Sequence, residues 1–375
     1  MKNLPVLLCV FCAILCFGCR ERPANPAADA LESLAAEGSI PGAVALAARD
    51  GKIFCFAAAG FADLESRRPM ERDTVFWIAS QTKSVTAAAL MALVDDGRAS
   101  LDDPVSKYVP ELKGLRLRSG AAVPDGKVTL RAILCHTAGF SEMPPASSMP
   151  KLDSVPLSGQ MKIFAGMPLE FFPGEGYRYS NIGINIIGRV IEAASGIPYA
   201  EFVKERILDP LEMRDTSFFP SPEQAARIAS PYAAGASGNG FKKVSIPFFT
   251  YPLNSPGREP FPAGGFFSTA EDVLKFCVML AGGGVYGGKR ILSEAAAEQM
   301  RKKQTPAGVN ERYGLCMSLS DGGYGHGGIY GTGMWISGDG RVVLVYLVQR
   351  AGKFPKNGDS GADVFRRAAW DMARR

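Results

Sequence analysis

The sequence predicts an α/β (α+β) fold in which an antiparallel sheet is flanked by helices and interrupted by an inserted, mostly helical lobe. Strand patterns occupy both ends of the chain, whereas helical patterns dominate its middle. With 375 residues, 47% of them apolar, the chain is long enough to bury a large core. We therefore expect one domain over residues 29–375, with sheet parts at about 29–75 and 276–375 and the helical lobe at about 76–275.

The first 19 residues have the pattern of a signal peptide. Lys2 precedes an apolar run over residues 4–17, which is too short for a usual membrane span. Gly18-Cys19 closes the run and resembles a bacterial lipoprotein cleavage site, so Cys19 is the candidate for lipidation. Plain secretion after a different cleavage is the alternative. Residues 20–28 form a linker, and we expect an exported protein, either periplasmic or held at the bacterial cell envelope only by a lipid anchor.

The other elements follow from periodicity and turn residues. A hairpin is expected over residues 43–59, because Asp50-Gly51 is a typical turn between apolar strands. An alanine-rich helix follows Ser80, and a second helix over residues 183–194 is closed by Gly196. The remaining expected elements are helices at 27–37 and 362–375, and strands at 312–318, 334–337 and 341–349.

Charge and cysteine usage narrow the class of protein. The 42 basic and 37 acidic residues are interspersed, which is typical of a solvated surface and gives no indication of nucleic-acid binding. Four cysteines beyond the signal region lie far apart, without the paired spacing of a zinc site. We expect buried free thiols, with disulfides as the alternative, and neither a metal nor a cofactor. These cysteines are Cys55, Cys135, Cys277 and Cys316.

Ser80 and Lys83 lie three residues apart at the start of the alanine-rich helix, a spacing that places both side chains on one helix face. A serine hydrolase needs a nucleophile, a nearby base and a donor for the developing oxyanion, and a helix start supplies all three. A lysine with its ordinary pKa of about 10.4 is protonated at neutral pH, but burial and the helix dipole both disfavour the charged form. The alternative is an N-cap serine beside a solvated lysine.

Two further triplets favour the catalytic interpretation. Tyr179-Ser180-Asn181 follows a turn, precedes an apolar helix and is the only Tyr-x-Asn of the chain. His326-Gly327-Gly328 comes just before a hairpin predicted around residues 338–340. A second Ser-x-x-Lys pattern at Ser148 lies in a proline-rich stretch where no helix can form, so we discount it.

With these three motifs in this order, the chain resembles the serine hydrolases related to class C β-lactamases and penicillin-binding proteins. Their order is Ser-x-x-Lys, Tyr-x-Asn, then Lys-Thr-Gly or His-x-Gly. Residues 134–140 look like the family's Leu-x-His-Thr-Ser-Gly loop, and residues 263–272 look like its Gly-Gly-x-x-Ser-Thr-x-x-Asp segment. The resemblance implies a β-lactamase/transpeptidase-like fold, in which an antiparallel sheet is covered by helices and the site lies in the cleft.

The resemblance also assigns roles to the matched residues. Ser80 would be the nucleophile, and Lys83 and Tyr179 would together take its proton and hand it to the leaving group. A neighbouring ammonium would help Tyr179 to reach the phenolate form. Asn181 would hydrogen-bond Lys83 and a substrate carbonyl.

The oxyanion hole is implied at the backbone N–H groups of Ser80 and Ile329. Gly327 and Gly328 would let this strand edge approach the substrate closely. His326 is expected to contact the substrate. It stands where true class C enzymes have a lysine, and a histidine is mostly neutral at pH 7. The missing permanent charge weighs against β-lactams and against peptides with a free carboxylate. It favours esters, amides or D-amino-acid derivatives as small-molecule or peptide substrates.

Two hypotheses therefore stand. The first is a serine hydrolase that acts through an acyl-enzyme, as an esterase, a D-amino-acid peptidase or a β-lactamase. The second is a non-catalytic envelope protein that keeps the fold and binds peptidoglycan peptides or a protein partner. In either case the glycine- and proline-rich stretches 141–160 and 231–265 are expected to border the cleft.

Overall fold

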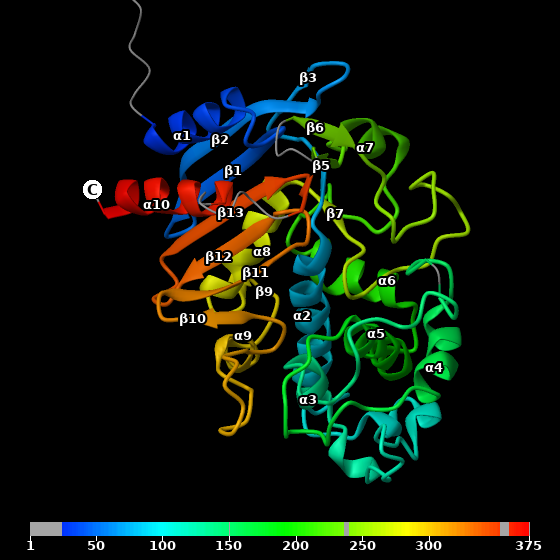
Figure 1. The fold of residues 1–375 in the computed structure, drawn as a ribbon. Coiled ribbons are helices and arrows are strands. Elements are labelled where there is room, and N and C mark those ends of the chain that lie inside the picture. Colours follow the sequence, from blue (N-terminus) through cyan, green and yellow to red (C-terminus); the bar gives the residue numbers. More distant parts are fainter. Residues whose placement is uncertain (1–24, 150, 236–239, 353–359, 375) are drawn as a thin grey trace, which may run out of the picture.

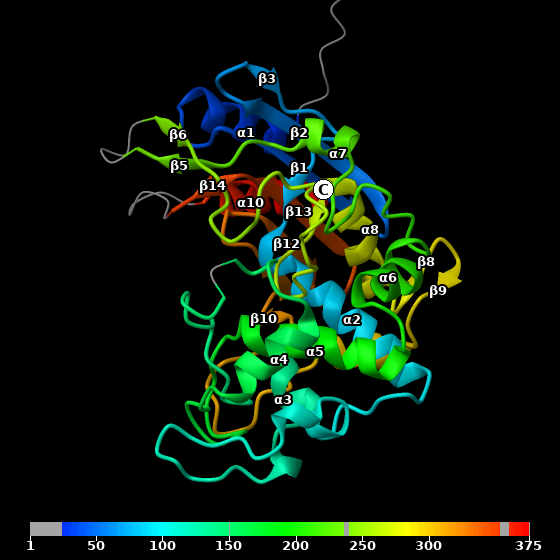
Figure 2. The ribbon, with the colours of Figure 1, turned by 90° about the vertical axis from the view of Figure 1, so that its right-hand side faces the viewer.

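The computed structural model describes residues 25–149, 151–235, 240–352 and 360–374. The predicted signal peptide with Cys19, and most of the predicted linker, lie outside the described residues. No helix within the described ranges combines the length and the apolar character that are needed to cross a membrane. A sheet with helices on both faces lies beside a lobe that is largely helical (Figures 1 and 2).

The sheet has seven strands in the order β10-β11-β12-β13-β1-β2-β3, and each neighbouring pair is antiparallel. Strands β1 to β3 come from the N-terminal part of the chain and strands β10 to β13 from its C-terminal part, as predicted. Their bounds are β1 (Gly42–Arg49), β2 (Lys52–Asp63), β3 (Arg68–Pro69), β10 (Ser318–Ser320), β11 (Gly323–Gly327), β12 (Gly333–Ser337) and β13 (Val342–Val348).

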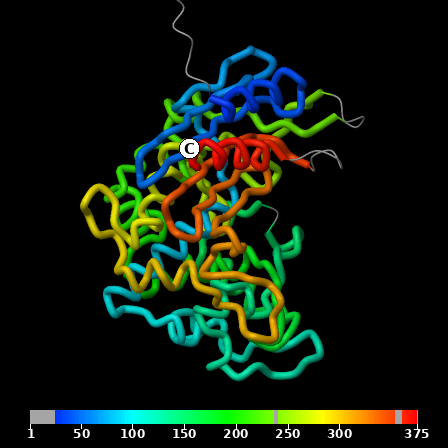
Figure 3. Tube along the Cα trace, turned by 90° about the vertical axis from the view of Figure 1, so that its left-hand side faces the viewer, coloured from blue at the N-terminus to red at the C-terminus, as the bar shows by residue number. Residues whose placement is uncertain are grey.

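Both faces of the central strand β1 are buried. Every second side chain, such as Ala45, faces α1 (Pro26–Ala36) and α10 (Gly361–Arg374). These two helices lie side by side over the sheet (Figures 1 and 3). The side chains between them, such as Leu46, belong to the main core, where α8 (Ala270–Ala281) covers the opposite face of the sheet. The helix α8 packs against β1, β12 and β13 and extends across residue 275, where the predicted lobe ends.

The lobe is built around α2 (Thr82–Asp95) and α5 (Asn181–Ser195), which pack against each other. All residues from Thr82 to Leu93 are buried, because the small side chains of this alanine-rich helix let neighbouring elements approach from every side. The helix α5 ends at Gly196, which has a φ of 79° and closes the helix as predicted. Other helices are α3 (Leu130–Leu134), α4 (Leu157–Ala165), α6 (Tyr199–Val203), α7 (Pro222–Arg227) and α9 (Glu294–Arg301).

The exposed edge of the sheet differs from the prediction. The sequence predicts a strand over residues 312–318, but there Tyr313 makes only an isolated bridge to Ser318, where β10 begins. The strand between β10 and β12 is β11, with the sequence Gly-Tyr-Gly-His-Gly. Glycine has a low strand preference, so local pattern does not reveal β11, and pairing on both sides holds it in the sheet. His326 and Gly327 therefore lie within a strand.

Further short strands lie outside the seven-stranded sheet. The pairing of β4 with β7 places the segment before Ser80 beside the segment that follows Gly264. A three-stranded sheet has the order β14-β5-β6, and β8 forms a hairpin with β9. The bounds are β4 (Phe76–Trp77), β5 (Tyr232–Ala234), β6 (Phe241–Lys243), β7 (Phe267–Ser268), β8 (Val285–Tyr286), β9 (Lys289–Arg290) and β14 (Arg350–Ala351).

The four cysteines in the described residues are free and buried, which confirms the expectation of thiols. Burial raises the pKa of each thiol, so these groups stay protonated and are poor nucleophiles.

A buried ion pair joins the two long loop regions of the lobe. Arg258 Nε lies 2.6 Å from Asp153 Oδ2, and the two side chains are 1% and 0% exposed. Asp153 also accepts hydrogen bonds from the backbone N–H and the hydroxyl of Thr250. Arg258 donates to the carbonyl oxygens of Phe218 and Leu253. The pair thus cross-links segments that have no regular secondary structure of their own.

We expect Asp153→Ala to lower the free energy of unfolding by about 3–5 kcal/mol, because it leaves the Arg258 charge buried without its partner. Urea denaturation measures the loss. Arg341→Ala is the control, since it breaks an exposed ion pair with Asp50 and should change stability little. The double variant Asp153→Leu, Arg258→Met should lose less than Asp153→Ala, because it removes both charges. Equal losses from Asp153→Ala and Arg341→Ala would contradict this account.

Candidate active site

A cavity of about 290 Å³ lies between the lobe and β11, and Ser80 is in its wall. Its lining comes from β4, the turn after β4, the start of α5 and the turn after β11. Residues from the two predicted border stretches, 141–160 and 231–265, complete the wall. The lining residues are Trp77, Ala79, Ser80, Glu142, Met143, Leu152, Tyr179, Asn181, Phe248, Phe261, Ala263, Gly264 and Ile329.

The nucleophile candidate Ser80 lies in a 3₁₀ turn, Ala79–Gln81, that leads directly into α2. Ala79 has a φ of 48°, a left-handed conformation that costs a non-glycine residue about 1–3 kcal/mol. This residue turns the chain sharply between β4 and α2. No side-chain cap bond occurs at the start of this turn or of α2, so the N-cap alternative for Ser80 is excluded.

Lys83 is completely buried, and its amine contacts three oxygens from distant parts of the chain. Nζ lies 3.0 Å from Ser80 Oγ, 2.7 Å from Asn181 Oδ1 and 2.5 Å from the Ala263 carbonyl oxygen. Burial lowers the pKa of Lys83 to about 7, although Cys316 and Glu142 oppose the shift. A neutral amine has two N–H groups and one lone pair. The amide and carbonyl oxygens take the two N–H groups, and the lone pair is left for the Ser80 hydroxyl.

Tyr179 and Asn181 reach the cavity from the segment that enters α5. Asn181 is the first residue of α5, and Ser180 caps the helix by accepting from the Gly183 N–H. The Tyr179 ring lies 4.8 Å from Lys83 Nζ. Burial raises the pKa of the Tyr179 phenol well above its usual value, and the hydrogen bond with Ser80 only partly offsets this. Burial thus opposes the phenolate form that a neighbouring ammonium was expected to favour.

His136 supports this segment from behind. Its Nδ1 accepts a hydrogen bond of 3.2 Å from the backbone N–H of Ser180, and its ring lies 4.5 Å from the Tyr179 ring. Burial, together with the charges of Lys83 and His326, keeps the pKa of His136 well below its ordinary value. His136 is therefore a neutral group that fixes the Tyr179-Ser180-Asn181 backbone.

Gly328 and Ile329 bring the turn after β11 to the nucleophile. A Cβ on Gly328 would lie 2.2 Å from Thr332 Oγ1 and 2.8 Å from the Ile78 carbonyl oxygen, so only glycine allows this approach. The same atom on Gly327 would make only ordinary contact, at 3.5 Å from the nearest atom. Of the two glycines, the structure thus requires Gly328. The side chain of Ile329 is 63% exposed beside the cavity.

His326 does not line this cavity, although the sequence predicts that it contacts substrate. Its Nε2 lies 2.8 Å from the Tyr313 hydroxyl, and its Nδ1 lies 2.8 Å from the Gly327 carbonyl oxygen. Burial and the charge of Lys83 lower the pKa of His326 to about 4. The expectation of a neutral histidine therefore agrees with the structure, but both of its ring nitrogens are used within the protein.

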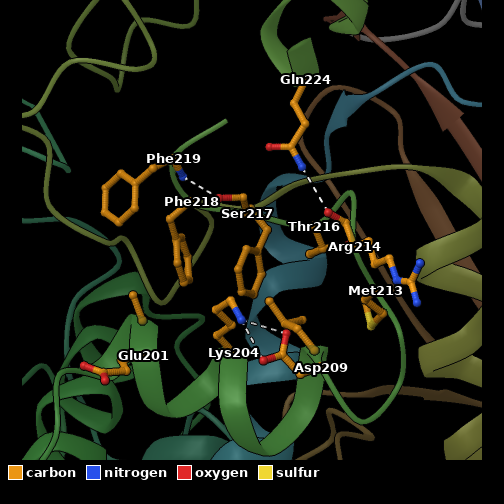
Figure 4. A pocket seen from close by; sticks show the side chains of 13 residues that line it. Glu201, Lys204, Asp209, Met213, Arg214, Thr216, Ser217, Phe218, Phe219 and Gln224 are labelled. Carbon is orange, nitrogen blue, oxygen red and sulfur yellow. Dashed lines mark hydrogen bonds and ion pairs between the residues drawn. The ribbon is translucent and has the colours of Figure 1, made fainter. Parts of the chain in front are cut away.

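A larger cavity of about 400 Å³ lies elsewhere in the lobe, between α6 and α7 (Figure 4). Its polar groups bind one another: Lys204 pairs with Asp209, and the Gln224 side chain donates to the Arg214 carbonyl. It contains no serine beside a buried base, so it does not compete with the Ser80 cavity as a reaction site. Within the described ranges, no cluster of three or more His, Cys, Asp or Glu side chains could hold a metal ion.

Comparison with known proteins decides the family. The model of the family described as beta-lactamase matches residues 27–365. The chain belongs to the beta-lactamase family. Protein Rv1367c of Mycobacterium tuberculosis is 30% identical over 354 residues, which cover 83% of this chain and 86% of that protein. Esterase EstB of Burkholderia gladioli is 31% identical over 302 residues, which cover 74% of this chain and 73% of the esterase.

Solved structures of beta-lactamase relatives share the fold. EstCE1, described as a hydrolase with promiscuous acyltransferase activity, superposes with a TM-score of 0.79 over 92% of this chain and 97% of its own, at 24% identity. The D-amino acid amidase of Ochrobactrum anthropi SV3 gives a TM-score of 0.73 over 93% of this chain and 98% of its own, also at 24% identity. These likenesses confirm the predicted β-lactamase/transpeptidase-like fold.

Proposed function

We propose that the chain is a serine hydrolase that cleaves esters with uncharged, apolar acyl groups through an acyl-enzyme. The observation that carries the proposal is the environment of Lys83. Two carbonyl-type oxygens hold its amine, burial keeps its pKa near 7, and Ser80 Oγ lies 3.0 Å away. A general base works best when its pKa is close to the working pH.

The proposed reaction begins with proton transfer from the Ser80 hydroxyl to the Lys83 amine while Oγ bonds to the ester carbonyl carbon. The carbonyl oxygen becomes an oxyanion, and the N–H groups of Ser80 and Ile329 would donate hydrogen bonds to it. The C–O bond to the alcohol then breaks, and the alcohol leaves with one proton. Water cleaves the acyl-enzyme by the same steps in reverse order, which restores Ser80.

Tyr179 is proposed to relay the proton rather than to remove it. Its phenol stays protonated because burial raises its pKa, and it hydrogen-bonds Ser80. The protonated phenol would take a proton from the Lys83 ammonium while it donates its own proton to the oxygen of the departing alcohol. No phenolate then has to accumulate. The two residues keep a shared role, with Lys83 as the base.

The cavity lining supports the substrate class. Most lining side chains are apolar, and Trp77, which is among them, has its indole N–H occupied by the Gly264 carbonyl. No lysine, arginine or histidine is among the lining residues, and Glu142 is the charged one. A substrate carboxylate would find no cation there and would meet a like charge. The relatives include an esterase and a D-amino acid amidase, and the bonds that these names indicate, esters and amides, fit a reaction at a carbonyl carbon.

We expect wild-type protein to hydrolyse p-nitrophenyl butyrate and to cleave nitrocefin, a carboxylate-bearing β-lactam, poorly. Ser80→Ala should lose at least about 100-fold of the esterase rate, because the nucleophile is gone. Steady-state kinetics measures both substrates. A fluorophosphonate probe should label wild type once and Ser80→Ala not at all, as judged by mass spectrometry. Rapid nitrocefin turnover would contradict the substrate class. No labelling and no turnover of any ester or D-amino-acid amide would favour the non-catalytic envelope protein.

The pH dependence tests the base. Protonated Lys83 cannot take the serine proton, so kcat/KM for p-nitrophenyl butyrate should fall as the pH drops below about 7 and level off above it. Lys83→Met should lower the rate about 100- to 10,000-fold, and the fall of kcat/KM below about pH 7 should disappear. A rate that instead rises only above pH 9 in the wild type would indicate an ordinary lysine and overturn the assignment.

A further inference from the structure

Behind the cavity lies a buried layer of aromatic rings that the proposed reaction does not use. Tyr313 is 2% exposed and comes from the irregular segment between α9 and β10. Its ring lies 5.1 Å from the ring of His136 and 5.8 Å from the ring of Tyr177. Its hydroxyl is 2.8 Å from His326 Nε2, which connects this segment directly to β11.

The two hydrogen bonds of His326 determine where its proton lies. The Gly327 carbonyl oxygen, 2.8 Å from Nδ1, can only accept a hydrogen bond, so Nδ1 carries the proton. Nε2 of the neutral ring then has a lone pair, and the Tyr313 hydroxyl must be the donor to it. His136 has the opposite form, because its Nδ1 accepts from the Ser180 N–H and its Nε2 carries the proton.

These bonds control the backbone that follows His326. The imidazole holds the Gly327 carbonyl, which fixes the orientation of the peptide between Gly327 and Gly328. The Gly328 N–H donates to the Thr332 carbonyl at 2.8 Å, and its carbonyl accepts from the Gly331 N–H at 2.9 Å. The next amide is that of Ile329, the proposed oxyanion donor. Its direction therefore depends on a chain of contacts that begins at Tyr313.

We propose that Tyr313 is a positioning residue whose hydroxyl locks the His326 ring and thereby holds the Ile329 amide in place for the oxyanion. The inference rests on the proposed hydrolase function and adds a residue that does not touch substrate. The other titratable groups that face His326 are Lys83, His136 and the Tyr179 ring. None of them is hydrogen-bonded to Nε2, so Tyr313 supplies the bond that determines the ring's orientation.

The test is Tyr313→Phe, which removes one hydroxyl and keeps the ring. With p-nitrophenyl butyrate, kcat should fall about 10- to 100-fold while KM changes less than about threefold, because a displaced oxyanion donor weakens the transition state more than the bound substrate. Tyr177→Phe is the matched control in the same aromatic layer, since its ring contacts His136 and Tyr313 but makes no hydrogen bond to His326. It should keep kcat within about twofold of wild type.

Imidazole ¹⁵N NMR gives a readout that loss of packing alone would not produce. The chain has 2 histidines, so the signals are readily assigned. In the wild type His326 should be the Nδ1–H tautomer and His136 the Nε2–H tautomer. In Tyr313→Phe the His326 signal should move toward a mixture of tautomers while that of His136 stays unchanged.

Three results would overturn the inference: an Nε2–H tautomer of His326 in the wild type, an unchanged kcat in folded Tyr313→Phe, or an equal loss in Tyr177→Phe. The first needs no variant, so it decides the matter even if Tyr313→Phe fails to fold. Failure of the proposed function is distinguishable, since esterase activity would then survive Ser80→Ala while the histidine tautomers stayed as expected.

Discussion

The structure depends on one constraint, which is the burial of the Lys83 amine. Moving Lys83 out of water disfavours its ammonium form, but the neutral amine still needs acceptors for its N–H groups. Those acceptors are Asn181 at the start of α5 and the Ala263 carbonyl before β7. Three segments of the lobe therefore meet at this nitrogen, and the proposed base is also a packing centre.

The groups around this amine leave it without a strong counter-ion. His136 and His326 are both neutral, and burial also keeps Tyr179 and Tyr313 protonated. A carboxylate in this layer would stabilise the ammonium and raise the pKa of Lys83 far above neutral pH. Neutral rings exclude water and position the backbone without this effect. His326, which stands where the class C enzymes have a lysine, therefore adds no charge beside the proposed base.

Local spacing predicted the part of the site that local geometry builds. Ser80 and Lys83 are one helical turn apart, and Asn181 opens a helix whose apolar pattern is clear, so their convergence was readable. The strand β11 could not be predicted from the sequence. Its glycines allow neighbouring backbone to lie close, but they do not give the alternating apolar pattern of a strand. The contact of Tyr313 with His326 was equally hidden, since an unpredicted strand on one side and an irregular segment on the other leave no periodic signal. The raised pKa of Tyr179 was equally hidden, because the extent of its burial is a property of the whole fold.

The loops of the cavity wall are joined to each other and also to the chemical groups. The buried pair Asp153–Arg258, 105 residues apart in the chain, ties together the loops that carry Leu152 and Phe248. The loop with Phe248 also carries Ala263, whose carbonyl oxygen accepts from Lys83 Nζ, and the other loop carries Met143, whose sulfur accepts from the Asn181 side chain. A shift of either loop would therefore reach the base or its amide partner, so the fit of the acyl group and the position of the base are coupled through these two contacts.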